Sequence, residues 1–412
     1  MTTKPDLSVE FCGLKFPNFM VLASAPPTGS GPMIRRAFEK GWGGAVTKTI
    51  KTDSIPIKDV SPRFAALKDG SGEVYGFENF ELVTPKPLAY WTTEIAATKE
   101  QFPDRILIAS IMAELTREKW HELALAVEKA GADAIELNLS CPHGMPEQGL
   151  GHAMGQNPEI TAMVVGWVKE AVKIPVIAKL SPNVTDVTVI VKAAEKAGAD
   201  GISAINTVQC LLGVNLNTML PVPTVNTMST FGGYSGEAVR PIGLRIAAQI
   251  AGCSSLPLMG IGGISKWDHA AEYILLGASA VQVCTAVMLK GYGMVRKVLT
   301  GMEKYLAEKG LQSVSELRGR SLPCLTSHEK LSHTHKVAPS FDGETCQRCG
   351  ACVVACRDGG HQALSVTEDF VPQVDVNACD GCALCSLACK TGSITMTVIS
   401  KSTELSAVSH QP

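Results

Sequence analysis

The stretch Ala130-Gly131-Ala132-Asp133-Ala134-Ile135-Glu136-Leu137-Asn138 shows the unit from which most of this chain is built. An amphipathic segment at 120–129 precedes it, with apolar residues on one side and charged residues on the other. Gly131 is the residue type expected just past a helix C-terminus, and an apolar run follows it at once. The same Ala-Gly-Ala-Asp order recurs at 197–200. Because strands that are apolar throughout are buried on both faces, they indicate a parallel sheet.

Eight such apolar runs are found between residues 18 and 290. They lie at 19–23, 45–49, 106–111, 134–139, 176–180, 201–205, 258–261 and 280–283. Helical patterns fill most of the gaps between them. Eight alternating units predict an α/β fold, the (β/α)8 TIM barrel. A doubly wound open sheet fits less well because the nearest match to a dinucleotide fingerprint, at 260–265, lacks its third glycine. For the same reason we do not expect this chain to bind NAD(P) itself.

Polar residues stand at the ends of several of these predicted strands, where TIM barrels carry their chemistry. Lys48 and Lys179 lie within apolar runs, and a lysine there is costly to bury without a partner. Structural ion pairing would explain one such lysine. Two lysines together with Asn138 and Asn206 instead predict a ring of amides and cations around a ligand.

Two glycine groups lie near the last two strands, at 232–236 and at 262–263, each before a predicted helix. Backbone N–H groups at helix starts bind phosphate, and barrels commonly place a phosphate site after strands seven and eight. Either group alone is weak evidence, because loops often contain glycine. Together they predict a phosphate-bearing redox cofactor, such as FMN.

The C-terminal part carries two copies of one cysteine run, Cys-x2-Cys-x2-Cys-x3-Cys, at 346–356 and at 379–389. It resembles the run that holds two [4Fe–4S] clusters in bacterial ferredoxins, in which the fourth cysteine of each run binds the other cluster. The resemblance implies a small α+β domain with two ligand sets. These are Cys346, Cys349, Cys352 and Cys389, and Cys379, Cys382, Cys385 and Cys356.

Zinc and disulfides are the alternative explanations of these eight cysteines. Zinc sites commonly use two separated pairs of ligands, and disulfides need an oxidising compartment, so both fit the repeated run less well. The proline that usually follows the fourth cysteine is replaced by Arg357 and Lys390. A cation beside a cluster is expected to raise its reduction potential.

Composition limits the class of protein. The 412 residues suffice for one large and one small domain. The net charge of −2 gives no indication of a nucleic-acid-binding surface, and 45% of residues are hydrophobic. We expect a barrel at 1–310, a linker at 311–335, a two-cluster domain at 336–400 and a mobile tail at 401–412. The polar start and the lack of a membrane-spanning run predict a cytoplasmic protein. The remaining cysteines are then free thiols: Cys12, Cys141, Cys210, Cys253, Cys284 and Cys324.

Three stretches resemble the dihydropyrimidine dehydrogenase family. They are Asn-Leu-Ser-Cys-Pro-His-Gly-Met at 138–145, Ala-Lys-Leu-Ser-Pro-Asn-Val-Thr-Asp at 178–186, and Gly-His-Gln-Ala at 360–363 behind the first cysteine run. The resemblance extends from about residue 5 to residue 400 and is strongest to the bacterial FMN and iron–sulfur subunit of the NAD-dependent enzyme. The barrel also resembles the related dihydroorotate dehydrogenases.

The resemblance implies roles for residues that match. FMN would be bound by Ser24, Lys48, Lys179, Asn206, Gly236, Gly262, Gly263 and Thr285. A pyrimidine would be bound by Asn79, Asn138, Asn206 and Thr207, since amide side chains offer both a donor and an acceptor. Lys179 would place positive charge beside the reduced flavin.

Cys141 would be the general acid that gives a proton to C5 of the pyrimidine. The alternative is a buried, inert thiol. The segment at 142–155 is either a lid over the substrate or an ordinary surface loop. His143 stands where many dihydroorotate dehydrogenases have asparagine, and we expect no catalytic role for it.

The resemblance further implies a partner subunit that binds FAD and NAD(H), with a homodimer of this chain inside a heterotetramer. The predicted reaction interconverts uracil or thymine and their 5,6-dihydro forms. Two alternatives remain open at this point: a dihydroorotate dehydrogenase-like enzyme, and an electron-carrier subunit without catalysis.

Overall fold

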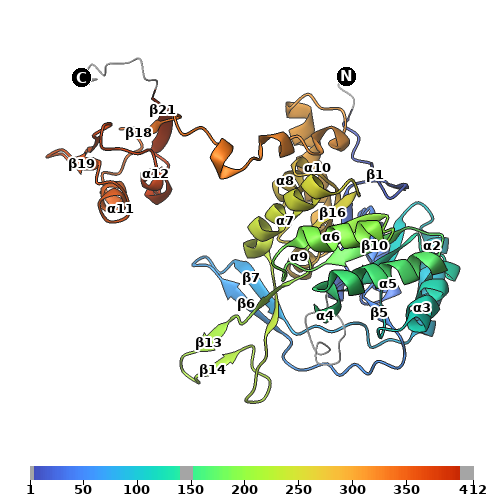
Figure 1. The fold of residues 1–412 in the computed structure, drawn as a ribbon. Coiled ribbons are helices and arrows are strands. Elements are labelled where there is room, and N and C mark those ends of the chain that lie inside the picture. Colours follow the sequence, from blue (N-terminus) through green and yellow to red (C-terminus); the bar gives the residue numbers. More distant parts are fainter. Residues whose placement is uncertain (1–3, 140–151, 400–412) are drawn as a thin grey trace. The chain divides into compact units, whose positions relative to one another are not determined.

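The computed structural model describes residues 4–139 and 152–399. The chain forms two compact units, Met1–Leu325 and Thr326–Pro412 (Figure 1). Their boundary falls within the segment that was predicted as a linker. Each unit is described by itself.

Eight parallel strands of the first unit form a closed barrel, which confirms the predicted TIM barrel (Figure 1). Closure comes from the pairing of the second barrel strand with the third, β4 with β8, which joins the two ends of the sheet. The barrel strands are β3 (Met20–Leu22), β4 (Gly44–Val46), β8 (Ile106–Met112), β9 (Ala134–Asn138), β10 (Val176–Leu180), β11 (Gly201–Ala204), β16 (Leu258–Ile261) and β17 (Ala278–Val283). Each coincides with one of the eight predicted runs to within three residues at either end.

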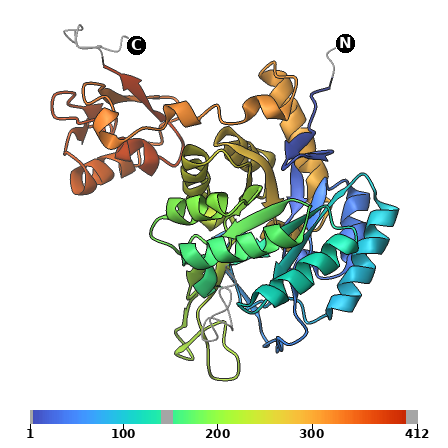
Figure 2. The same cartoon turned by 45° about the vertical axis from the view of Figure 1, so that its right-hand side comes forward.

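Helices cover the outside of the barrel (Figure 2). The helices of this unit are α1 (Gly31–Lys40), α2 (Leu88–Gln101), α3 (Arg117–Lys129), α4 (His152–Gly155), α5 (Pro158–Ala171), α6 (Val187–Lys196), α7 (Arg240–Cys253), α8 (Trp267–Leu275), α9 (Thr285–Lys290) and α10 (Met294–Glu308). Gly131 and Gly198, which were predicted to end helices, adopt φ angles of 96° and 93°. Because this left-handed conformation favours glycine, the two Ala-Gly-Ala-Asp turns lead from α3 and α6 straight into the next strand.

The N-terminal end of the barrel is closed by a hairpin of β1 (Val9–Phe11) and β2 (Leu14–Phe16). A Cβ atom on Gly201, the first residue of β11, would lie 2.5 Å from Cys12 Sγ, so the hairpin packs directly against the strand starts. Leu311, Val314 and Leu317, which fall in the predicted linker, are buried in the same core. This part of the predicted linker is therefore a packed part of the first unit.

The opposite end of the barrel carries a four-stranded antiparallel sheet in the order β12-β15-β7-β6. Two long insertions supply it, one between β4 and β8 and one between β11 and α7. Its strands are β6 (Phe64–Lys68), β7 (Val74–Asn79), β12 (Val208–Cys210) and β15 (Gly232–Ser235), and the same insertions contain β5 (Ile50–Lys51), β13 (Gly213–Asn215) and β14 (Leu220–Val222). The sheet rises from strand C-termini, where the barrel fold places its active sites.

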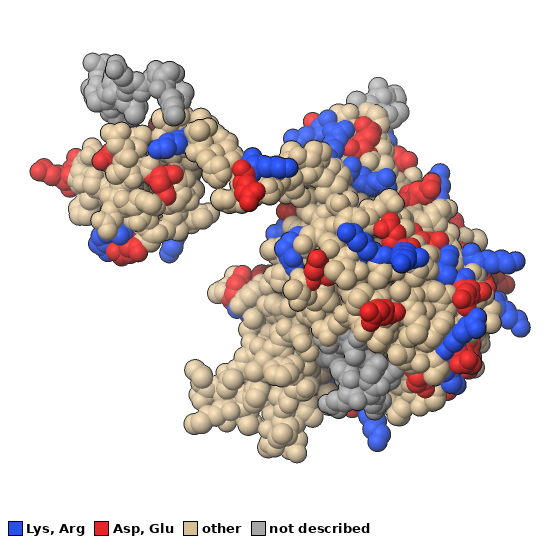
Figure 3. Space-filling model, in the orientation of Figure 1, with Lys and Arg blue, Asp and Glu red and all other residues tan. Residues whose placement is uncertain are grey.

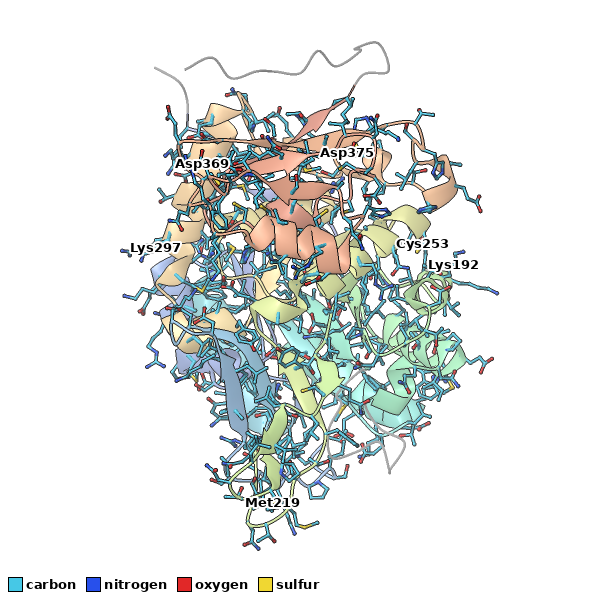
Figure 4. The ribbon with its side chains drawn as sticks, turned by 90° about the vertical axis from the view of Figure 1, so that its left-hand side faces the viewer. Lys192, Met219, Cys253, Lys297, Asp369 and Asp375 are labelled. Atoms are coloured by element: carbon cyan, nitrogen blue, oxygen red, sulfur yellow. The ribbon has the colours of Figure 1, made fainter. Side chains whose placement is uncertain are left out.

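The hairpin of β13 and β14 belongs to a segment without formal charge. Residues 201–236 contain no Asp, Glu, Lys or Arg, and the surface over this hairpin is free of charged side chains in Figure 3. Met219 stands at its tip (Figure 4), and Leu216, Met219 and Phe231 are exposed. The segment thus presents an uncharged surface that includes exposed apolar side chains.

The second unit pairs β18 (Val337–Phe341) with β21 (Ile394–Val398), and β19 (Leu364–Val366) with β20 (Pro372–Val374). Its helices α11 (Ala351–Gly359) and α12 (Leu384–Ala388) each follow a residue with a left-handed backbone, Gly350 or Ala383. Both residues lie between the second and third cysteines of a run, so the two runs fold alike. This α+β arrangement agrees with the predicted ferredoxin-type domain.

Candidate active site

A cavity opens at the C-terminal end of the barrel beneath the antiparallel sheet. It encloses about 1300 Å³ of empty space, its open mouth included, which is ample for a cofactor and a small substrate together. The structure brings to it every described residue that was predicted to bind FMN or a pyrimidine. These are Ser24, Lys48, Asn79, Asn138, Lys179, Asn206, Thr207, Gly236, Gly262, Gly263 and Thr285. Cys141 and His143 lie outside the described residues.

Lys179 reaches the cavity from the middle of the barrel. It lies on β10, and its Nζ is 3.2 Å from Oε1 of Glu136 on the neighbouring strand β9. Glu136 is fully buried and also accepts hydrogen bonds from Ser203 Oγ (2.9 Å) and Gln282 Nε2 (2.7 Å). The lysine is thus held by a carboxylate whose other contacts come from two further strands.

Lys48 enters the cavity just past the end of β4 and forms an ion pair with Glu81, which follows β7. Glu81 is shared, because Arg63 Nε lies 3.2 Å from its other oxygen. Arg63 in turn lies 2.6 Å from Asp59. Lys48 therefore belongs to a chain of charges that runs toward the surface, unlike the enclosed pair at Lys179.

The amide side chains of the cavity are oriented by contacts within the protein. Asn138 Nδ2 donates to Thr49 Oγ1 at 2.9 Å. Asn79 Nδ2 donates to the carbonyl of Gly233 at 2.9 Å, and Asn206 Oδ1 accepts from the backbone N–H of Thr207 at 2.8 Å. Each contact restricts the rotation of an amide that faces the cavity, so the groups are pre-oriented for a ligand with a fixed pattern of C=O and N–H.

The glycine-rich end of the cavity has the backbone that a phosphate needs. Gly236, Gly262 and Gly263 have φ angles of 92°, 126° and 70°, which side-chain-bearing residues rarely adopt. The hydroxyl of Tyr273 donates to the carbonyls of Ile261 (3.1 Å) and Gly262 (2.8 Å) and fixes this turn. These residues fit a phosphate held by backbone N–H groups at the start of α8.

Glu237 also lines this end of the cavity, and a carboxylate there would repel a phosphate unless it is neutralised. It is hydrogen-bonded by Ser265 Oγ, and Lys290 Nζ lies 4.0 Å away. The nearby lysine and hydroxyl offset its charge. The phosphate assignment therefore rests on the glycine backbone rather than on a cluster of cations.

Sequence reasoning missed Glu81 and Glu136, the partners that fix the two lysines, and Gln282, which hydrogen-bonds Glu136. Glu136 carried a readable signal, because it lies two residues before Asn138 in an apolar strand and so points to the same side of the sheet. A carboxylate, like a lysine, is costly to bury without a partner. Glu81 lies in an irregular segment and carried no comparable signal.

One thiol of the described cavity lining is Cys284, which follows β17. Burial raises its pKa to about 11, against the opposing influence of Lys48 and Lys179. It therefore carries its proton at neutral pH. That both lysines act on one thiol also reflects how closely the charged groups of the cavity are gathered.

A second, smaller cavity lies in the second unit. Cys356, Cys379, Cys382 and Cys385 all line it, and these four are one of the two ligand sets implied by the ferredoxin resemblance. Within the described residues, no three His, Cys, Asp or Glu side chains are close enough to hold a single metal ion. In a [4Fe–4S] cage each thiolate binds a different iron, so the ligands stand farther apart than around one ion.

The cysteine set of the other cluster includes Cys389. Hydrogen bonds involving the hydroxyls of Ser393 (3.3 Å) and Thr391 (3.4 Å) lower its pKa to about 6. A thiol with a lowered pKa is readily present as the thiolate that iron requires. The four cysteines Cys346, Cys349, Cys352 and Cys389 remain a predicted set.

Both units of the chain match known protein families. Residues 6–306 match the family "Dihydroorotate dehydrogenase" and residues 340–396 match "4Fe-4S dicluster domain". The chain belongs to the dihydroorotate dehydrogenase family. It is 42% identical to the NAD-dependent dihydropyrimidine dehydrogenase subunit PreA of Escherichia coli K12 over 364 residues, 87% of each chain.

Two other relatives are named for two different enzymes. The chain is 41% identical to the chloroplastic dihydropyrimidine dehydrogenase (NADP+) of Arabidopsis thaliana over 347 residues, 82% of each chain. It is 40% identical to the catalytic subunit of dihydroorotate dehydrogenase B (NAD+) of Pyrococcus abyssi over 319 residues. That match covers 99% of the Pyrococcus chain but 77% of this one, whereas the PreA match is longer than the first unit alone. The resemblance stated from the sequence is thereby confirmed.

In the part of the chain that the structure describes, no helix is long and apolar enough to cross a bilayer.

Proposed function

We propose that this chain interconverts uracil or thymine and their 5,6-dihydro forms as the cofactor-bearing subunit of a dihydropyrimidine dehydrogenase. One observation carries the proposal: a single cavity is lined by three amide side chains, Asn79, Asn138 and Asn206, next to two buried lysines. A pyrimidine presents alternating C=O and N–H groups along its edge. Amides recognise both kinds of group, so the cavity suits a neutral pyrimidine.

The lysines and glycines are assigned to the cofactor. Lys48 and Lys179 would contact the ring of FMN, Ser24 and Thr285 would line it, and the turn at 262–263 with Gly236 would hold the phosphate. Bound FMN would supply the hydride for C6 of the pyrimidine, or accept it in reverse. A cation beside the flavin favours the state with more negative charge, which is the part that Lys179 would perform.

Cys141 is assigned the proton at C5. A thiol with an ordinary pKa of about 8.5 is mostly protonated at neutral pH and can donate, and its thiolate can remove the same proton in reverse. Reduction of the C5–C6 bond takes up two electrons and two protons in all. The amides hold the ring while Cys141 transfers its proton.

The electrons are proposed to reach the cavity through the two clusters. The family relative PreA is named as a subunit of an NAD-dependent enzyme, and no dinucleotide fingerprint is found in this sequence. A partner that binds FAD and NAD(H) would then supply or remove them. The exposed apolar hairpin of β13 and β14 supports a contact with another protein chain, as a homodimer within a heterotetramer requires.

Anaerobic titration of the purified protein with dihydrouracil, and separately with dihydroorotate, tests the substrate. Bleaching of the flavin absorbance by dihydrouracil alone is expected. Bleaching by dihydroorotate alone would instead favour dihydroorotate dehydrogenase activity, which the Pyrococcus relative keeps as the second candidate. A bound flavin that responds to neither compound would contradict both assignments.

Cys141→Ala is expected to lower turnover by at least about a hundredfold, because a positioned general acid contributes that much. Flavin and iron content should stay at native levels. Cys253→Ala is the matched control, since Cys253 lies at the end of α7 and does not line the cavity (Figure 4). Equal turnover in the two variants would rule out the assigned role of Cys141.

A further inference from the structure

Glu136 is a carboxylate buried inside the barrel with no exposed surface. Lys179, Ser203 and Gln282 contact it from three other strands, β10, β11 and β17, at 3.2, 2.9 and 2.7 Å. In the strand register Lys179 lies beside both Asn138 and Ser203. Glu136, two residues before Asn138, therefore lies one layer below the cavity floor, and its contacts Lys179 and Gln282 both line the cavity.

A buried carboxylate is costly unless it is paired with a cation and hydrogen-bonded. Ser203 and Gln282 supply neutral hydrogen bonds, and Lys179 supplies the charge. The side chains of Lys179 and Glu136 are 6% and 0% exposed, against 11% and 14% for Lys48 and Glu81. Glu81 has a second cation in Arg63, so the two lysines differ: one pair is closed and exclusive, and the other is open and shared.

Resting on the proposed binding of a flavin in this cavity, we propose that Glu136 is a positioning residue that keeps Lys179 protonated in both redox states of the flavin. The charge beside the flavin would then be constant, and no proton would enter or leave at this lysine when electrons arrive. The other charged or titratable side chains of the described cavity lining are Lys48, Glu81, Tyr234, Glu237, Cys284 and Lys290. Of the two carboxylates, Glu81 pairs with Lys48, and Glu237 contacts Ser265 and Lys290.

The physical reason lies in the cost of an unpaired buried ammonium. Without Glu136 the charge of Lys179 would be desolvated and would feel Lys48 as a like charge, and both effects favour the neutral amine. An arriving pair of electrons would then draw a proton onto Lys179. Without the carboxylate, Lys179 would thus take up a proton when the flavin is reduced, whereas with it the charge of Lys179 stays constant.

Glu136→Gln is a change that the barrel interior can accommodate. The glutamine has the shape of glutamate, and Gln282 Oε1 has no hydrogen-bond partner among the described residues. Rotation of the Gln282 amide by half a turn would place that oxygen against the new Nε2, and the Ser203 hydroxyl can donate or accept. The variant therefore removes the charge while keeping the contacts.

The pH dependence of the flavin reduction potential measures the proton directly. For the native protein we expect one proton per two electrons between about pH 6.5 and 8.5, and for Glu136→Gln two protons per two electrons, so that the slope doubles. The double variant Glu136→Gln with Lys179→Met should return to one proton, because the titrating amine is gone. Ser203→Ala, which removes a hydrogen bond but no charge, should keep the native slope. A native slope in Glu136→Gln would overturn the proposal.

Labelling of lysines in the flavin-free protein tests the same pair without relying on the cofactor. Only a neutral amine reacts with an acylating reagent, so each unit by which the pKa falls raises reactivity about tenfold. Mass spectrometry should find Lys179 labelled at least about tenfold faster in Glu136→Gln than in the native protein, with Lys192 on the surface as reference. Equal labelling would overturn the proposal, whereas increased labelling in a protein that fails the dihydrouracil titration would locate the error in the proposed function.

The native protein alone also provides a test if the variant does not fold. At neutral pH the acylating reagent should then label Lys179 no faster than Lys192 in the native protein, because only a neutral amine reacts. Faster labelling of Lys179 than of Lys192 would show that Glu136 does not keep the lysine charged, and would contradict the proposal.

Discussion

Glu78 illustrates how a single residue can tie stability to pH. It lies on β7 and is fully buried, and its Oε2 accepts a hydrogen bond from the backbone N–H of Leu212 at 3.0 Å. Burial raises the pKa of its carboxyl, and the hydrogen bonds from Cys210, Leu212 and Gly232 only partly oppose this. The folded protein therefore retains a proton that the unfolded chain releases above its ordinary pKa of 4.5.

Stability contributed by this proton is present below pH 4.5 and is lost as the pH rises through the raised pKa of the folded state. Glu78→Gln has no charge to bury, so we expect its melting temperature to exceed that of the native protein by an amount that grows as the pH rises above 4.5. Thermal unfolding at several pH values measures this difference. A difference that stays constant with pH would show that the carboxyl does not titrate as described.

Packing around a helix decides whether an added methyl group raises or lowers the free energy of unfolding, and two glycines inside helices illustrate the two cases. A Cβ on Gly166 in α5 meets nothing within 4 Å. A Cβ on Gly243 in α7 would lie 1.9 Å from the hydroxyl of Tyr273, the group that holds the carbonyls of Ile261 and Gly262. The second site therefore couples a helix on the outside of the barrel to the phosphate end of the cavity.

Gly166→Ala should raise the free energy of unfolding by about 0.5–1 kcal/mol, because alanine is the better helix former. Gly243→Ala should lower it by about 1–3 kcal/mol, because the methyl group overpacks the site, and should also lower the flavin content of the purified protein. Chemical denaturation and absorbance spectra measure both quantities. If Gly243→Ala kept full flavin content, Tyr273 would not be needed to shape the glycine turn.

The two units of the whole molecule have very different cores. The first has a large apolar core built from every barrel strand and its surrounding helices. The buried core of the second consists of Cys352, Cys356, Ala363, Leu364, Cys385 and Ile394, so half of its members are cysteines assigned to iron. A core of this size is too small to stabilise a domain without a cross-link such as a metal centre.

Removal of the iron by a chelator, or Cys385→Ser, should therefore unfold the second unit and leave the first folded. Calorimetry should show the barrel transition at its native temperature, and limited proteolysis should cut within residues 326–399 only after iron is lost. A metal-free protein that resists proteolysis there would contradict this view. Simultaneous loss of the barrel transition would mean that the units depend on each other for stability.

Local patterns in the sequence determined the architecture. The eight strands of the barrel are continuous apolar runs, and Gly131 and Gly198 mark helix ends because only their conformational freedom suits that position. The cysteine spacing determined the second unit in the same way, since a helical turn places Cys352 and Cys356 on one side of α11. Each of these features depends on residues that are neighbours in the chain.

Pairing of segments distant in the chain decided what neighbours in the chain could not. The partners of the two lysines, Glu81 and Glu136, lie 33 and 43 residues away from them, and the antiparallel sheet joins Asn79 to Gly233 across 154 residues. Such contacts exist only after the strands and insertions of the barrel have packed together. The sequence by itself determined which strand ends surround the cavity, because strand ends meet in any barrel, and only the tertiary structure decided which charge each lysine pairs with.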